Sequence, residues 1–235
     1  MELLQVEPAR QKFPGPLRAP NGRPLKSRTG YATFDLFQYL SAEAQEGFAL
    51  ACRRRLVPAG RRVYSQSEPA TEFFRIASGS IRVSVLRDDG REALQSVLQT
   101  GDCFGICSMI DGGTRYQTTT ANEAVELQVL HREACERLRS QHSSFGDGLV
   151  RHMSRHSRLL SDYFVSSTLD ELSSRVAMRL LGLSVALSQS EIALMVGASR
   201  QAVNKVLQKF QVDGLIHIEY GSVRLLDIER LRCLV

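Results

Sequence analysis

Short runs of alternating hydrophobic and polar residues fill the middle of the chain, between about residues 56 and 131. Each run has the two-residue period of a half-buried strand, and turn sequences such as Ser78-Gly79-Ser80 separate the runs. Many short strands at this spacing favour a barrel or a sandwich. The predicted strands cover residues 56–57, 62–64, 73–76, 81–85, 94–98 and 125–129.

The residues before this region show no strand period. Residues 1–30 are rich in proline, glycine and arginine, and they are predicted to form a flexible arm. Residues 31–52 have a helical pattern, in which Ser41 and Glu43 open a second short helix.

A helical period also follows the predicted strands, from about residue 145 to residue 164. Hydrophobic positions recur there in steps of four and three, which is the spacing of a coiled-coil seam. The pattern predicts a long helix that pairs with another helix, or one that packs against its own strand domain. The seam consists of Leu149, Met153, His156, Leu160 and Tyr163.

The segment 188–210 predicts two short helices that meet at a glycine. Ser188 and Glu191 have the spacing of a capping box, in which each side chain satisfies a free backbone N–H at the helix start. Gly197 suits the positive φ of a sharp helix end, and Ser199 suits the cap of the next helix. This arrangement predicts a helix-turn-helix whose second helix is the candidate DNA reader.

The second helix of this pair has one hydrophobic and one polar side. Arg200, Gln201, Asn204 and Lys205 share the polar side. Arginine can bond guanine bidentately, and glutamine or asparagine can do the same for adenine. The alternative is an ordinary amphipathic hairpin with a solvated face, but an alternating stretch at 216–225 predicts a β-hairpin wing, which favours the DNA reader.

Composition restricts the class of protein more than it identifies it. The chain of 235 residues carries a net charge of +5, with six basic and two acidic residues in 1–30 but eight and seven in 168–235. Bulk charge therefore does not by itself indicate DNA binding. No stretch approaches the roughly 20 apolar residues of a membrane span, and no apolar signal-peptide core is present, so we expect a cytoplasmic protein. The five cysteines suit reduced thiols.

The order of these elements resembles the Crp/Fnr family of bacterial transcription regulators. The most specific stretches are FRIASGSIRV at 74–83, GDCFG at 101–105 and VGASRQAVNK at 196–205. The resemblance implies an α+β fold with a jelly-roll-like, double-stranded β-roll, a long dimerisation helix and a winged helix-turn-helix. The implied domains are a flexible arm (1–30), a β-roll effector domain (31–138), a dimerisation helix (139–167) and a DNA-binding domain (168–235).

The resemblance also implies partners and roles for single residues. Such proteins pair as homodimers, here through about residues 145–164, and bind palindromic double-stranded DNA, with RNA polymerase as a further partner. A two-fold dimer places its reading helices about 34 Å apart, in successive major grooves. By resemblance Ser199 contacts phosphate, Arg200 takes guanine, and Gln201 and Lys205 contact neighbouring bases or phosphate. Because glutamate stands at position 201 in well-known members, we expect a shifted half-site.

The resemblance is weakest in the effector pocket. Members that bind cyclic nucleotides hold the ribose hydroxyl with a Gly-Glu pair and the phosphate with an Arg-Ser pair. This chain has Gly105-Ile106, then Arg115 followed by Tyr116, so the ribose acceptor and the serine are missing. We therefore expect cyclic AMP to be disfavoured. The candidate ligand-binding residues are Gly105, Ile106, Arg115, Tyr116, Leu160 and Ser161.

Several possibilities remain open at this stage. Arg115 either binds the phosphate of another ligand, such as a cyclic dinucleotide, or is a surface arginine. The protein either has a nucleotide effector or acts without one. No cofactor is required and no metal site is predicted, since His152 and His156 lack a third ligand nearby. Enzyme motifs are absent from the sequence. The alternative function is a nucleotide-binding regulatory module whose C-terminal domain does not read DNA.

Overall fold

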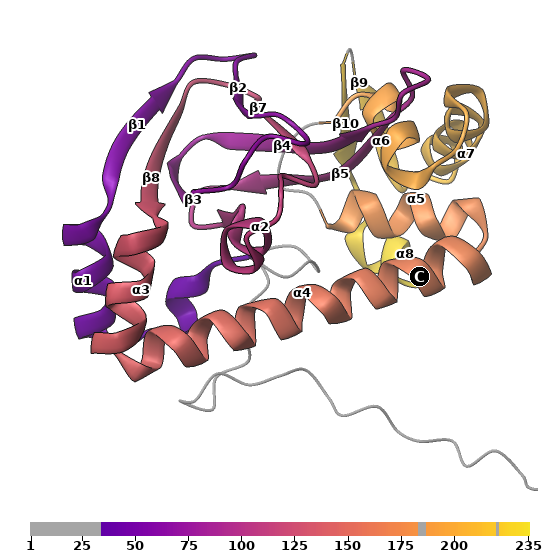
Figure 1. Ribbon diagram of the computed structural model, residues 1–235. Helices are drawn as coiled ribbons and strands as arrows, with labels where there is room; N and C mark the ends of the chain where they lie inside the picture. Colours follow the sequence, from indigo (N-terminus) through magenta and orange to yellow (C-terminus); the bar gives the residue numbers. More distant parts are fainter. Residues whose placement is uncertain (1–33, 183–186, 220) are drawn as a thin grey trace, which may run out of the picture.

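The computed structural model describes residues 34–182, 187–219 and 221–235 (Figure 1). A β-roll comes first in the chain, a long helix runs beneath it, and a helical unit with a small hairpin completes the molecule. The expected α+β fold is confirmed. The predicted arm at 1–30 lies outside the described residues, as does Tyr220 in the turn of the predicted wing.

Two four-stranded antiparallel sheets form the β-roll, with the orders β1-β8-β3-β6 and β2-β7-β4-β5. Their inward side chains, such as Ile76, Ile81 and Leu127, make a shared core, because alternate residues of a strand point to one face. All six predicted strands are confirmed. The strands are β1 (Arg53–Val57), β2 (Arg62–Tyr64), β3 (Glu72–Ser78), β4 (Ser80–Leu86), β5 (Glu92–Gln99), β6 (Cys103–Phe104), β7 (Thr118–Ala121) and β8 (Val125–His131).

A helical cluster closes one end of the roll. It has its own core, in which Phe48, Phe73 and Phe145 are fully buried. Ser41 accepts a hydrogen bond from the N–H of Ala44 at 3.3 Å, so the predicted cap is confirmed. The cluster consists of the 3-10 helix η1 (Leu36–Tyr39), α1 (Ala42–Ala51), α3 (Arg132–Gln141) and the start of α4 (Ser143–Leu169), while α2 (Ile106–Asp111) lies between β6 and β7.

The long helix α4 has 27 residues, so it extends beyond the predicted range of 145–164. Its first half packs on the helical cluster through Phe145 and Leu149, and Met153 contacts the same core. His156 lies against the ring of Phe34, with the ring centroids 5.3 Å apart. This part of the predicted seam therefore contacts its own chain, which was the alternative reading of the pattern.

The C-terminal unit is built around a third core. Leu94 and Val97 of β5 belong to this core, so the unit is docked on the β-roll through strand β5. The N-cap of α5 is Glu171, two residues after the end of α4. The elements are α5 (Leu172–Leu181), α6 (Gln189–Val196), α7 (Arg200–Val212), β9 (Ile216–Glu219), β10 (Ser222–Leu225) and α8 (Ile228–Arg232).

Among the described residues, no helix is both long and apolar enough to cross a membrane.

Candidate DNA-binding and effector sites

The turn between α6 and α7 forms as the sequence indicates. The capping box of Ser188 and Glu191 is complete, with Glu191 accepting from the N–H of Ser188 at 2.7 Å. Gly197 ends α6 with a φ of 65°, a left-handed conformation that favours glycine. Ser199 then caps α7 by accepting from the N–H of Ala202 at 3.1 Å. Its hydroxyl proton remains available to a phosphate, because the cap uses only the oxygen as an acceptor.

The polar side of α7 faces away from the protein core. Arg200, Gln201 and Lys205 are exposed, and no ion pair holds either cation within the described residues. Asn204 is different, because it is half-buried and its Oδ1 is buried without a hydrogen-bond partner in the described part of the chain. Three of the four polar side chains predicted to face DNA are therefore presented to solvent on one edge.

The hairpin β9–β10 lies directly after the reading helix and has the form expected of a wing. Ile218 pairs with Val223 across the hairpin, and the N–H of Ile218 donates to Oε1 of Gln211 on α7 at 2.7 Å. Arg224 is exposed on the hairpin and forms an ion pair with Glu219 at 3.0 Å. The wing thus adds an exposed arginine beside α7, a residue that the sequence analysis did not single out.

Arg115 lies inside the β-roll and is only 3% exposed, so it is not a surface arginine. Its guanidinium donates to the carbonyl oxygen of Gly105 at 2.9 Å and to that of Glu72 at 2.6 Å. The Nε atom is buried without a partner among the described residues, and burial lowers the pKa of Arg115. The guanidinium carbon also lies 4.2 Å from the ring centroid of Tyr64.

Aromatic rings fill the interior next to Arg115. The rings of Phe74 and Phe104 stack with centroids 5.0 Å apart, and Tyr64 stacks on Phe74 at 5.8 Å. Burial raises the pKa of Tyr64 to about 12. A Cβ atom on Gly105 would meet Nη1 of Arg115 at 2.6 Å, so this glycine lets the guanidinium approach the backbone. The groups that surround Arg115 are thus mostly aromatic rings and backbone carbonyls.

The other candidate ligand residues lie in different environments. Ile106 is buried, whereas Tyr116 is 69% exposed and Leu160 is 54% exposed. The hydroxyl of Ser161 donates to the carbonyl of Ser157 on its own helix at 3.1 Å. Within one chain the structure therefore brings Gly105, Ile106 and Arg115 together, and not the remaining three. No group of three or more metal-ligating side chains occurs in the described ranges.

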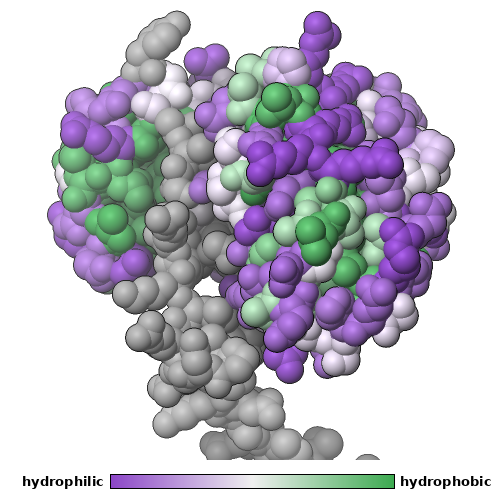
Figure 2. Space-filling model, turned by 90° about the vertical axis from the view of Figure 1, so that its left-hand side faces the viewer, coloured by the Kyte–Doolittle hydropathy of each residue, from purple (hydrophilic) through white to green (hydrophobic). Residues whose placement is uncertain are grey.

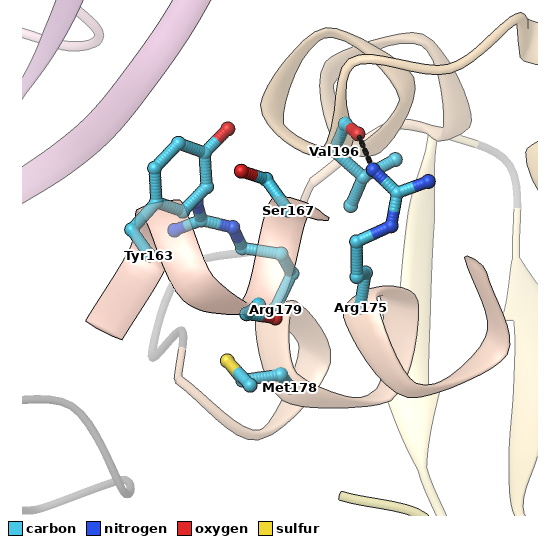
Figure 3. Close-up of a pocket in the computed structure, with 7 residues that line it drawn as sticks. Tyr163, Ser167, Arg175, Met178, Arg179 and Val196 are labelled. Atoms are coloured by element: carbon cyan, nitrogen blue, oxygen red, sulfur yellow. Dashed lines mark hydrogen bonds between the residues drawn. The ribbon is translucent and has the colours of Figure 1, made fainter. Parts of the chain in front are cut away.

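A junction between α4, α5 and the end of α6 was missed by the sequence analysis (Figure 3). The hydroxyl of Tyr163 donates to the carbonyl of Met195 at 2.9 Å, and Nη1 of Arg175 donates to the carbonyl of Val196 at 2.9 Å. The guanidinium of Arg179 lies 4.4 Å from the ring centroid of Tyr163. The cavity between them is about 10 Å³, which is space for one water molecule at most.

Comparison with known proteins matches both halves of the chain. Residues 54–142 match the cyclic nucleotide-binding domain, and residues 165–234 match the Crp-like helix-turn-helix domain. The chain is similar to the CRP-like cAMP-activated global transcriptional regulator of Mycobacterium tuberculosis, with 31% identity covering 74% of this chain and 84% of that protein. It is also similar to the cyclic AMP receptor protein of Thermus thermophilus, with 27% identity covering 80% and 90%.

A solved structure shows the same fold. FixK2 from Bradyrhizobium japonicum matches with a TM-score of 0.70 and 21% identity, over 78% of this chain and 96% of that one. The two chains thus share one overall fold over most of their length. Given the identity to the mycobacterial regulator over most of both chains, this protein belongs to the Crp/Fnr family of bacterial transcription regulators.

Proposed function

We propose that this protein is a homodimeric regulator that reads palindromic double-stranded DNA with α7. The observation that carries the proposal is the exposed edge of Arg200, Gln201 and Lys205 on a helix that begins directly after a tight turn. Arginine and glutamine side chains on such an edge fit guanine and adenine, and Ser199 fits a phosphate oxygen. Such a regulator would act in the cytoplasm and contact RNA polymerase.

An exposed apolar surface on α4 supports the homodimer. Val150, Leu160 and Phe164 are 65%, 54% and 69% exposed, and the half-buried Met153 lies between them on the same side of the helix. Exposed apolar residues at helical spacing are best buried against a second helix. A second copy of α4 would cover this stripe, which is shifted from the predicted seam because Leu149 and His156 already contact their own chain.

The effector site supports divergence from cyclic AMP binding. The mycobacterial relative is named as cAMP-activated, but here Ile106 stands where a ribose acceptor is expected and cannot accept a hydrogen bond through its side chain. Two of the five N–H donors of Arg115 are already used by backbone carbonyls, so a phosphate would share this guanidinium with the protein's own backbone. We propose that the effector is a different nucleotide, such as a cyclic dinucleotide, or that the protein acts without one.

The test is selection of bound duplexes from random DNA, followed by affinity measurements with and without cyclic AMP and a cyclic dinucleotide. We expect a palindrome with a guanine in each half-site. Replacing Arg200 with alanine should relax that guanine at a loss of about 1–3 kcal/mol per contact. Lys205→Ala should weaken all sequences alike and reduce the salt dependence. A protein that binds nucleotides but no duplex would support the alternative module.

A further inference from the structure

The reading helix is attached to the rest of the protein through α6, because only three residues separate the end of α6 at Val196 from Arg200. Gly197 makes this connection a tight turn, so a rotation of α6 is passed directly to α7. The contacts that hold α6 therefore decide how the reading edge is oriented relative to α4 and the β-roll.

The C-terminal end of α6 is tied to α4. The last carbonyls of a helix have no partner inside the helix, so they must be satisfied from outside. Tyr163 of α4 donates to the carbonyl of Met195. Arg175 of α5 donates to the carbonyl of Val196, as Figure 3 shows. A cation near a helix C-terminus is favourable, since the helix dipole is negative there. Arg179 stacks on the Tyr163 ring and holds it in place.

The N-terminal end of α6 is tied to the β-roll. Glu191, which completes the capping box, forms an ion pair with Arg82 of β4. The side chains are only 27% and 19% exposed, so the pair is partly protected from solvent. Between the two ends, Leu94 and Val97 of β5 share the core of the C-terminal unit. One end of this short helix is thus held by α4 and α5, and the other end by the β-roll.

We propose that Tyr163 is a positioning residue for DNA reading, whose hydroxyl sets the angle of α7 against α4. The proposal rests on the function proposed above, because it concerns the spacing of the two reading helices in a dimer. A dimer must present both edges about 34 Å apart on one face of the duplex. A DNA-binding domain whose angle to α4 varies still binds one half-site. The two domains of the dimer are then less often aligned with both half-sites at once.

The experiment compares Tyr163→Phe with the wild-type protein on three duplexes: the selected palindrome, the same palindrome with one base pair inserted between half-sites, and a single half-site. The substitution removes one hydroxyl and keeps the ring under Arg179. We expect palindrome affinity to fall about three- to tenfold, as for loss of one hydrogen bond. Half-site affinity should stay within about twofold, and discrimination against the inserted base pair should decrease.

Two further variants separate positioning from folding. Tyr39→Phe is the matched control, because the Tyr39 hydroxyl makes no hydrogen bond in the described part of the chain, and it should leave all three affinities unchanged. Glu191→Gln keeps the oxygen needed for the capping box but removes the charge that Arg82 binds. It should also weaken discrimination against the inserted base pair, because it loosens the other end of α6.

The outcomes distinguish this proposal from the one on which it rests. If the wild-type protein selects no sequence, the proposed function fails. If the wild-type protein selects a palindrome but Tyr163→Phe retains its spacing preference and affinity, the positioning role of Tyr163 is wrong. Equal losses on the half-site and the palindrome would show a merely structural role, and thermal melting of each variant would identify a loss of folded protein.

Discussion

The carboxylate of Asp102 accepts a hydrogen bond from the backbone N–H of Phe34 at 2.7 Å. The same carboxylate accepts from the N–H of Gln99 at 2.8 Å, so it joins the segment before η1 to the turn after β5. The ring of Phe34 lies edge-on to His152 and His156, with centroids 6.2 and 5.3 Å away. Asp102 and α4 are therefore connected through one aromatic residue, and each end of the connection carries a titratable group.

These groups predict opposing pH effects on stability. Burial raises the pKa of Asp102 from 3.8 to about 6 and lowers the pKa of His152 from 6.5 to about 4. Between pH 3.8 and about pH 6 the folded protein binds more protons at Asp102 than the unfolded chain does. The contribution of Asp102 to the stability of the protein therefore decreases as the pH rises. His152 has the opposite effect. Between pH 6.5 and about pH 4 the unfolded chain binds more protons at this residue, so the stability of the protein decreases as the pH falls.

We therefore expect Asp102→Asn to make the melting temperature fall more steeply than in the wild type between about pH 6.5 and pH 4.5, because the opposing effect of Asp102 is removed. Circular dichroism melts at a series of pH values measure the slope. The control is Asp88→Asn, which removes an exposed carboxyl from the turn between β4 and β5 and should leave the slope unchanged. Parallel curves for the wild type and Asp102→Asn would contradict this assignment.

Arg115 is expected to support the fold even without any ligand. Arg115→Met removes two hydrogen bonds to backbone carbonyls, each worth about 1.5–3 kcal/mol when the donor is charged. Urea unfolding of the ligand-free protein should therefore show a loss of about 3 kcal/mol. Arg53→Met, at an exposed position on β1, should change stability by less than about 0.5 kcal/mol. Equal stabilities of the two variants would mean that the Arg115 bonds contribute nothing.

Gly79 and Gly90 offer a matched test of close backbone approach. Both have a positive φ, of 90° and 81°, so alanine is strained at either position. A Cβ on Gly79 would also lie 2.8 Å from the carbonyl oxygen of Ala124, whereas one on Gly90 would have nothing within 4 Å. We expect Gly79→Ala to destabilise the protein by about 2–4 kcal/mol and Gly90→Ala by about 1 kcal/mol, measured in urea.

The residue at position 201 is expected to set the base next to the guanine. Gln201→Glu replaces a side chain that bonds adenine with one that accepts from the amino group of cytosine. Repeating the selection from random DNA should show a shift from adenine towards cytosine at one position of each half-site, while the guanine read by Arg200 stays. An unchanged preference would show that Gln201 does not touch a base.

The apolar stripe on α4 predicts the effect of a buried charge. Phe164→Glu places a carboxylate where a second copy of the helix would pack, so the dimer should dissociate at micromolar concentration in sedimentation experiments. Leu50→Glu is the matched control, because Leu50 of α1 is 82% exposed and lies outside this stripe. On the face of the molecule where α1 lies, the exposed apolar residues form patches that are scattered among hydrophilic residues (Figure 2). Dissociation of both variants would instead place the interface elsewhere.

Local sequence was enough to predict much of this architecture. The strand periods, the capping box of Ser188 and Glu191, and the glycine at 197 each report on a few neighbouring residues, and such signals depend little on the rest of the fold. The structure confirms these elements. The two-residue strand β6 and the short helix α2 were missed, because neither is long enough to show a period.

Tertiary structure alone decided which face each element presents. The sequence determined that α4 is an amphipathic helix, but only packing showed that Leu149 and His156 contact their own chain and that Phe164 is left exposed. The sequence likewise contains the arginine at 115 and the tyrosine at 163, but it does not identify the groups to which they donate hydrogen bonds. Gly105 and Met195 are carbonyl acceptors brought in by the backbone path, and any residue type supplies a carbonyl, so no sequence pattern could mark them.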